Sequence, residues 1–364
     1  MLFEFCRRNN VNKFLCSHGR DGSLKVWQLR PGDEPQMSAA LPVEGGTTHR
    51  KDPWLLHSLS VNTLNFCAFS LCKSLHATSD DLSASSPAVV AVPGIKDGYI
   101  DIWELPSERR LYSVPPPPDS KSGMVMAIRL LLMGGFLYLL SAFESGLAAV
   151  QVLSPEGTWT DIYSATPHSQ PILSLDVNPN FSQLFTSGAD DVIAVHSIPV
   201  LRASSTLLFA DMEEPKVLKT KHSGQQGLSV RNDGRIFATA GWDSRVRVYS
   251  VKTFKELAVL KWHKDGCYAT AFSTVLGEKE TSERPVADAA EAVPESIQDS
   301  EGLQDDDSLV PNIGEQPSGV VAHHSSGSLG SAPSFKQRRE DETRNKHWLA
   351  AGSKDGKISL WEIY

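Results

Sequence analysis

The stretch of the chain that decides the fold reads IFATAGWDSRVRVYS over residues 236–250. Small and apolar residues lead to a short turn at Asp243 and Ser244, and Val246 and Val248 follow that turn at every second position. Alternation with a period of two is typical of a β-strand, because successive side chains point to opposite faces of a sheet. Two such runs separated by turn residues predict a β-hairpin.

The same pattern recurs, giving six copies along the chain. Their turns are Asp21-Gly22, Asp97-Gly98, Ser145-Gly146, Asp190-Asp191, Asp243-Ser244 and Asp355-Gly356. The positions two and four residues after the second turn residue are apolar in every copy. These residues are Leu24, Val26, Ile100, Ile102, Ala148, Val150, Ile193, Val195, Val246, Val248, Ile358 and Leu360. A shared phase in all copies indicates a protein built from repeated short strands.

A second set of residues lies on the opposite face of the same strands, five places after the turn. It consists of Trp27, Trp103, Gln151, His196, Tyr249 and Trp361. Bulky groups on both faces indicate small sheets that are covered on both sides, as in radially stacked four-stranded blades. The pattern resembles that of WD repeats, which implies an all-β WD40 β-propeller.

The start of the chain is less regular than the later copies. Residues 1–13 lack the alternating first strand that precedes the hairpin elsewhere, for example in residues 171–177. We therefore expect a seven-bladed family architecture from which the first blade and part of the second are missing, with about six repeats present and one sheet edge open. A six-bladed ring that closes in another way is the alternative.

A long polar segment interrupts the last copy. Residues 277–346 contain 15 acidic and 7 basic residues and are rich in Ser, Pro and Gly. Such a segment cannot bury enough apolar surface to offset the entropy of ordering it. We expect one discontinuous propeller domain, residues 1–273 and 347–364, with residues 274–346 forming a disordered acidic insertion within the last blade.

Composition and motifs exclude several classes of protein. The net charge of −8 over 364 residues gives no basic excess for neutralising nucleic-acid phosphates. The five cysteines contain no C-x-x-C pair, so they are expected to be reduced thiols and not zinc ligands. No phosphate-binding loop, metalloprotease motif or nucleophile elbow occurs. We expect no enzyme activity, cofactor, bound metal or small-molecule substrate, and neither a signal peptide, a membrane contact nor a direct nucleic-acid contact.

The resemblance to WD repeats also implies buried hydrogen-bonded sets of His, Ser or Thr, Asp and an aromatic residue. The two most complete sets are His222, Thr239, Asp243 with Tyr249, and His168, Thr186, Asp190 with His196. A third set, His263, Asp355 and Trp361, has Ala351 in place of the hydroxyl residue. Buried polar groups are tolerated when they are paired, so the expected role of these sets is structural.

The predicted loop face around the central channel supplies the candidates for partner binding. Residues just before the turns should point there, and Trp and Arg are prominent in interface hot spots. The loop of residues 221–227 joins two copies on the same face. The candidate partner-binding residues are Trp242, Arg245, Arg20, Lys96, Lys354, Gln225 and Gln226.

Several stretches resemble one family more closely than WD repeats in general. They include KHSGQQGLSVRNDG at residues 221–234, AGWD at 240–243, LKWHK at 260–264 and the ending at 347–364. The chain is similar there to the fungal ASTRA-associated protein 1 family. This resemblance implies a non-catalytic scaffold subunit of the ASTRA complex in the nucleus, involved in chromatin remodelling and in maturation of phosphatidylinositol-3-kinase-like kinases. The implied partners are HEAT-repeat proteins, RuvB-like ATPases and the large kinase-like subunit.

A second hypothesis is a WD-repeat substrate receptor of a cullin-type ubiquitin ligase. Such receptors commonly carry Trp-Asp-x-Arg after a third strand. Here Gln or Glu follows Trp27, Trp103 and Trp361, and the Asp is absent from all three. The ASTRA interpretation is therefore favoured.

Overall fold

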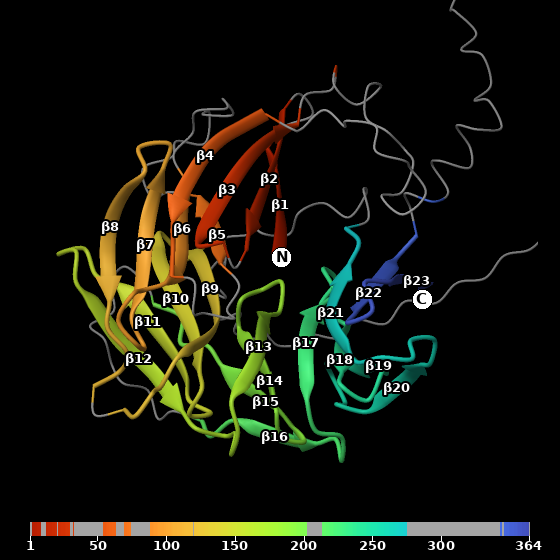
Figure 1. The fold of residues 1–364 in the computed structure, drawn as a ribbon. Coiled ribbons are helices and arrows are strands. Elements are labelled where there is room, and N and C mark those ends of the chain that lie inside the picture. The colour runs from red at the N-terminus through yellow and green to blue at the C-terminus, as the bar shows by residue number, and fades with distance from the viewer. Residues whose placement is uncertain are drawn as a thin grey trace, which may run out of the picture. The chain divides into compact units, whose positions relative to one another are not determined.

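The computed structural model describes residues 2–8, 12–19, 21–29, 32, 54–62, 69–73, 88–118, 120–201, 213–274, 343 and 346–363. The chain divides into two units, one of Met1–Val275 with Lys346–Tyr364 and one of Leu276–Asn345. All the strands of Figure 1 belong to the first unit. The predicted disordered insertion, apart from Thr274, Thr343 and Lys346, lies outside the described residues.

The strands of the first unit form six sheets, and consecutive strands of each sheet pair with one another (Figure 1). The first sheet contains β1 (Leu2–Arg8), β2 (Asn12–His18), β3 (Ser23–Leu29) and β4 (Trp54–Ser60). The second contains β5 (Ser70–Lys73), β6 (Ala88–Pro93), β7 (Ile100–Leu105) and β8 (Arg109–Val114). The third contains β9 (Val125–Met133), β10 (Phe136–Phe143), β11 (Ala148–Leu153) and β12 (Trp159–Ala165).

The remaining sheets follow the same order. The fourth contains β13 (Ile172–Val177), β14 (Gln183–Gly188), β15 (Val192–Ser197) and β16 (Lys216–Lys219). The fifth contains β17 (Gln225–Val230), β18 (Ile236–Gly241), β19 (Val246–Ser250) and β20 (Glu256–Leu260). The sixth has three strands among the described residues, β21 (Cys267–Phe272), β22 (Trp348–Ser353) and β23 (Ile358–Glu362).

Each sequence repeat corresponds to the hairpin between the second and third strands of one sheet. In the fifth sheet, β18 and β19 pair antiparallel with Ala240 opposite Val246, across the turn at Asp243 and Ser244. Ser244 has a φ of 64°, which closes this turn. The six hairpins and their antiparallel neighbours make the fold an all-β, six-bladed WD40 β-propeller.

Among the described residues the core consists of five apolar clusters, and each cluster joins two successive sheets. Between the fourth and fifth sheets, for example, Ile193 and Val195 pack with Leu228 and Phe237. The other clusters join the first sheet to the second, the second to the third, the third to the fourth and the fifth to the sixth. A single small sheet cannot bury its own apolar faces, so the stacking of neighbours supplies most of the hydrophobic stabilisation.

The twelve repeat positions separate into two groups in the structure. In the first five sheets all ten residues are buried, with at most 6% of their surface exposed. In the sixth sheet Ile358 is 69% exposed and Leu360 is 65% exposed. The buried pairs pack against the following sheet, and no further sheet follows β23 among the described residues.

The prediction that the first copy lacks an inner strand is wrong. Leu2–Arg8 forms β1, which pairs antiparallel with β2 from Leu2 opposite His18 to Arg8 opposite Asn12. The first sheet therefore has four strands. Strand pairing depends on backbone hydrogen bonds, which a segment can make without strictly alternating side chains. The polar residues Asn9 and Asn10 lie between the two strands in the sequence, and this turn signal could have revealed the hairpin.

The sixth sheet is assembled across the long insertion. β21 and β22 pair antiparallel from Cys267 opposite Ser353 to Phe272 opposite Leu349, although residues 273–347 separate them in the chain. The prediction that the strand beginning at Cys267 has its partner in the strand beginning at Trp348 is therefore confirmed.

Candidate functional site

The fourth sheet contains the most complete buried polar set. His168 Nδ1 lies 2.9 Å from Asp190 Oδ1, and His168 Nε2 lies 2.9 Å from Thr186 Oγ1. Thr186 Oγ1 lies 3.0 Å from His196 Nε2. The chain of contacts extends to Tyr163 of β12 in the third sheet, whose hydroxyl lies 2.8 Å from His196 Nδ1. The structure thus joins the predicted residues and adds a link between two blades.

One assignment of protons satisfies every member of this set. The Tyr163 hydroxyl donates to His196 Nδ1, His196 Nε2–H donates to Thr186, the Thr186 hydroxyl donates to His168 Nε2, and His168 Nδ1–H donates to Asp190. Burial, together with the neighbouring His168, lowers the pKa of His196 to about 3, so this imidazole is neutral. Thr186 has no exposed surface. The set resembles a hydrolase triad in residue type, but each of its members is at most 8% exposed, so the set is closed to solvent.

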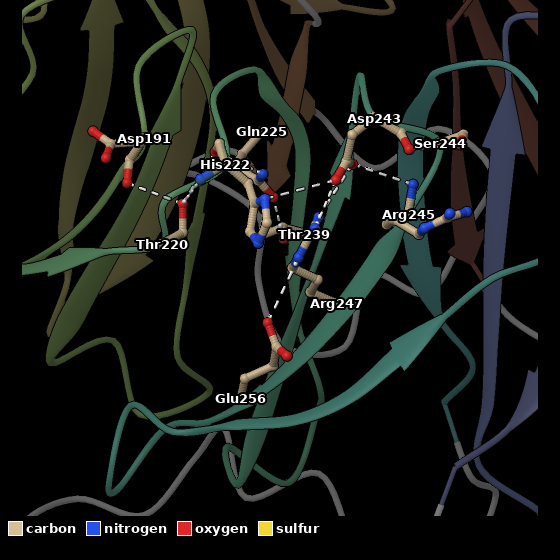
Figure 2. Close-up of polar contacts among 10 residues, drawn as sticks. All are labelled: Asp191, Thr220, His222, Gln225, Thr239, Asp243, Ser244, Arg245, Arg247 and Glu256. Atoms are coloured by element: carbon tan, nitrogen blue, oxygen red, sulfur yellow. Dashed lines mark hydrogen bonds and ion pairs between the residues drawn. The ribbon is translucent and has the colours of Figure 1, made fainter.

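The predicted set in the fifth sheet is wrong in one member. His222 is not bonded to Thr239; the Thr239 hydroxyl instead donates to Gln225 Oε1 at 2.6 Å, and Gln225 Nε2 donates to the His222 carbonyl at 3.0 Å (Figure 2). The His222 side chain is 44% exposed, with Nδ1 3.9 Å from Asp243 Oδ2. The backbone adopts positive φ at Lys221 and Gly224, and this turn directs the carbonyl of His222, and not its ring, toward Gln225.

Gln225 is therefore not a surface residue. Its side chain is fully buried, which contradicts its selection as a partner-binding candidate. Because Gln225 pairs with the Thr239 hydroxyl inside the blade, it occupies the place that the sequence assigned to His222. An amide can fill that place because it offers both an acceptor oxygen and a donor nitrogen.

Asp243 is held by an arginine that the sequence interpretation missed. Arg247 of β19 donates to Asp243 Oδ2 at 2.6 Å and to Oδ1 at 3.1 Å, and its Nε lies 3.6 Å from Glu256 (Figure 2). Burial, the largest single cause, raises the pKa of Asp243, but the hydrogen bonds and charge of Arg247, together with the Arg245 backbone N–H and His222, outweigh it and the pKa is lowered. Tyr249 interacts with Thr239 of the same predicted set: burial raises the pKa of Tyr249 to about 12, and Thr239 acts in the opposite direction. The Tyr249 ring stacks on Phe237 with the ring centres 5.1 Å apart.

In the sixth sheet, a hydroxyl from β23 takes the place of the hydroxyl that Ala351 of β22 lacks. Ser359 lies directly opposite Ala351 in the β22–β23 pair. His263 Nε2 lies 2.8 Å from Ser359 Oγ, and Trp361 Nε1 donates to the same oxygen at 2.9 Å. Asp355 does not join His263, contrary to the prediction; it pairs with Lys357 at 2.9 Å, and this contact lowers the pKa of Asp355 to about 2.

Trp242 is half-exposed and fixed in place at the turn of the fifth sheet. Its indole Nε1 donates to Gln226 Oε1 at 2.6 Å, and its backbone N donates to the Gly224 carbonyl at 2.9 Å. The ring covers Gly224 so closely that a Cβ at that position would overlap it. With 47% of its surface exposed, Trp242 presents one apolar side to solvent in a defined orientation.

The other predicted surface residues differ in their surroundings. Arg245 is bonded through its backbone N to Asp243 at 3.3 Å, and its guanidinium points away from that carboxylate in Figure 2. Lys354 is exposed, and its backbone N donates to Gly266. Lys96 contacts Tyr99 in its own turn, with Nζ 2.8 Å from the hydroxyl and 4.1 Å from the ring centre. Arg20 lies outside the described residues.

Comparison with known proteins agrees with the repeat architecture. The family model described as "WD domain, G-beta repeat" matches residues 215–250 and 343–362. An ASTRA-associated protein 1 from Penicillium rubens is 41% identical over 96% of this chain and 82% of its own length. Proteins of the same name are 40% identical in Aspergillus niger, over 96% of this chain and 81% of the relative, and 42% identical in Verticillium alfalfae, over 96% and 77%.

The chain belongs to the ASTRA-associated protein 1 family. The similarity extends over nearly the whole chain and so includes all six sheets. The family assignment made from residues 221–234, 240–243, 260–264 and 347–364 is therefore confirmed.

The remaining chemistry of the described residues is limited. Within the described part of the chain, no group of three or more His, Cys, Asp or Glu side chains could hold a metal ion. Burial raises the pKa of the Cys72 and Cys267 thiols to about 11, so both are protonated at neutral pH. No helix among the described residues has the length and apolarity to cross a membrane.

Proposed function

We propose that this protein is a non-catalytic scaffold subunit of the ASTRA complex that acts through protein–protein contacts. The family name of its relatives supports an association with that complex. The propeller supports the scaffold role, because its polar sets are buried inside the blades while its loops carry exposed aromatic and basic side chains.

The finer proposal concerns location and partners. The protein acts in the nucleus, and it serves chromatin remodelling and the maturation of phosphatidylinositol-3-kinase-like kinases. Its partners are the HEAT-repeat proteins, the RuvB-like ATPases and the large kinase-like subunit of the complex. The support for these points is the family resemblance.

The single observation that carries the scaffold role is the orientation of Trp242. A tryptophan that is 47% exposed and anchored through both its indole nitrogen and its backbone loses little side-chain freedom when it meets a partner. Trp side chains of this kind commonly dominate the binding energy of an interface. Gln226 is half-buried and acts as the positioning residue for the indole.

The test is affinity purification of the tagged full chain from nuclear extract, followed by mass spectrometry. Wild type and Leu257→Ala, a control whose side chain is 57% exposed on β20, should recover HEAT-repeat and RuvB-like subunits. Trp242→Ala should lose them while keeping the thermal unfolding midpoint of wild type. Recovery of a cullin and its adaptor instead would favour the ligase-receptor hypothesis, and full recovery with Trp242→Ala would remove Trp242 from the interface.

A further inference from the structure

Four loop segments of the fifth and sixth sheets meet around Trp242. The backbone N of Trp242 donates to Gly224, and the backbone N of Lys354 donates to Gly266, both at 2.9 Å. A Cβ at Gly266 would lie 3.3 Å from Trp242 Cα and 3.2 Å from Tyr268 Cε1. Gly266 therefore packs between the Trp242 backbone and the Tyr268 ring. These contacts bring together the loops that carry the residues we call the Trp242 surface: Lys221, Trp242, Arg245, Lys264, Lys354 and Tyr268.

The centre of the Trp242 surface is aromatic. Trp242 is 47% exposed and Tyr268, at the start of β21, is 39% exposed. Trp242 is fixed by its hydrogen bonds to Gln226 and Gly224, and the Tyr268 ring packs against Gly266, which also contacts the Trp242 backbone. The two aromatic side chains therefore lie on neighbouring loops. Tyr268 was missed by the sequence interpretation, because its position on an inner strand gave no reason to expect exposure.

The rim of the Trp242 surface is positively charged. Lys221, Lys264 and Lys354 are exposed and Arg245 is half-buried, and among the described residues none of the four forms an ion pair. The nearby carboxylates are already neutralised: Asp243 is bonded to Arg247 at 2.6 Å and Asp355 to Lys357 at 2.9 Å.

Asp265 is the remaining carboxylate of these loops, and it interacts electrostatically with Lys357. Within the described part of the chain, the loops therefore carry four cations without an ion pair and one exposed carboxylate. This excess of positive charge lies in a chain whose net charge is −8, and charge complementarity assigns an anionic occupant to the rim.

We propose that the Trp242 surface binds a short acidic protein segment that carries an aromatic side chain. The aromatic side chain packs on Trp242 and Tyr268, and the acidic residues on either side of it pair with the Lys and Arg rim. A nucleic acid fits less well, because four cations are few for a polyphosphate and Asp265 would face a ligand of uniform negative charge. The inference rests on the proposed partner-binding role of Trp242 and adds the chemistry of the partner.

The experiment measures fluorescence anisotropy of a fluorescein-labelled peptide, Gly-Glu-Asp-Glu-Trp-Glu-Asp-Glu-Gly, titrated with the purified full chain. We expect saturable binding that weakens as salt concentration rises. Trp242→Ala and the double variant Arg245→Glu with Lys354→Glu should each weaken it by about tenfold or more. Leu257→Ala and Arg235→Glu serve as matched controls, and neither should change the affinity by more than about twofold. Arg235 lies in the turn between β17 and β18, at the opposite end of the fifth sheet from Trp242.

Two variant peptides test whether the aromatic residue and the acidic residues of the parent peptide each contribute to binding. The same peptide with Ala for Trp, and a second with Gln and Asn for Glu and Asp, should each bind about tenfold more weakly than the parent peptide. The proposal is overturned if wild type fails to bind the parent peptide, if the neutral peptide binds equally well, if labelled oligothymidylate binds more tightly, or if Trp242→Ala leaves the affinity unchanged.

The outcome also separates this inference from the proposed function. If Trp242→Ala abolishes capture of the ASTRA subunits while the peptides show no preference for acidic residues, the acidic-segment proposal fails and the scaffold role stands. If the peptide binds as expected and Trp242→Ala still captures every subunit, the surface recognises acidic segments but does not attach the protein to the complex.

Discussion

Replacing Thr186 by Val removes one hydroxyl from the buried polar set of the fourth sheet. That hydroxyl accepts a hydrogen bond from His196 Nε2 and donates one to His168 Nε2. Valine keeps the β-branched shape, so the change removes two hydrogen bonds without opening a cavity. Both ring nitrogens then remain buried without a partner, because His168 is 3% exposed and His196 is 0% exposed.

The expected loss follows from the cost of unpaired buried groups. Each such group destabilises a protein by about 1–3 kcal/mol, so the two groups left by Thr186→Val should lower the free energy of unfolding by about 2–6 kcal/mol. In a domain of this size each kcal/mol shifts the thermal midpoint by about 2–4 °C, which gives a fall of about 4–24 °C. Circular dichroism during heating, together with urea unfolding of the same samples, measures both quantities.

The control is Thr186→Ser, which keeps the hydroxyl and removes one buried methyl group. We expect it to cost about 1 kcal/mol, clearly less than the valine variant. If Thr186→Val is as stable as Thr186→Ser or more stable, the polar set does not lock the blade and the structural role given to it is wrong.

Three further changes test other parts of the structure. The pKa of His196 is about 3 in the folded state and about 6.5 in the unfolded state, so between these pH values only the unfolded state binds the proton. The free energy of unfolding should therefore fall by about 1.4 kcal/mol per pH unit below pH 6.5. Urea unfolding of wild type and His196→Gln at a series of acidic pH values measures this slope. Ser359→Ala leaves the buried His263 Nε2 and the partly buried Trp361 Nε1 without their shared hydroxyl partner, and it should cost about 1–3 kcal/mol by urea unfolding. An unchanged free energy of unfolding would contradict the inference that Ser359 supplies the hydroxyl that Ala351 lacks. Gly224→Ala places a Cβ at a φ of 75° and in overlap with the Trp242 indole. It should lower the free energy of unfolding by about 1 kcal/mol or more and increase the quenching of Trp242 fluorescence by acrylamide. Unchanged quenching would mean that the ring does not pack on Gly224.

The strand positions could be predicted because the repeat encodes them locally. Val246 and Val248 alternate with polar residues after a turn, and the structure places both in β19 and buries both. The same alternation at Ile358 and Leu360 correctly predicts β23 but not their exposure. Periodicity reports which residues share a face of a strand, whereas burial depends on whether another sheet covers that face.

The polar sets were harder to predict because they depend on loop geometry and cross-strand pairing. His222 has the residue type expected of its repeat, yet the positive φ angles of its loop bring Gln225 to Thr239 instead. Ser359 replaces a hydroxyl missing from Ala351 only because the two residues lie opposite each other in the register. Spacing along the chain contains neither kind of information. The alternation Val-Arg-Val at residues 246–248 was a usable signal, since an arginine on the packed part of a strand requires a carboxylate partner such as Asp243.

The pairing of β21 with β22 has a consequence for how the sixth sheet is held together. β21 and β22 are joined by antiparallel pairing from Cys267 to Phe272, with one register shift between Cys267 and Ala269, and their covalent connection runs through the insertion. Cleavage of the peptide chain between residues 275 and 345 would leave this pairing in place. The C-terminal fragment, which contains Lys346–Tyr364, would then be a separate peptide bound to the larger fragment, and its retention would depend on dilution and not on chain continuity.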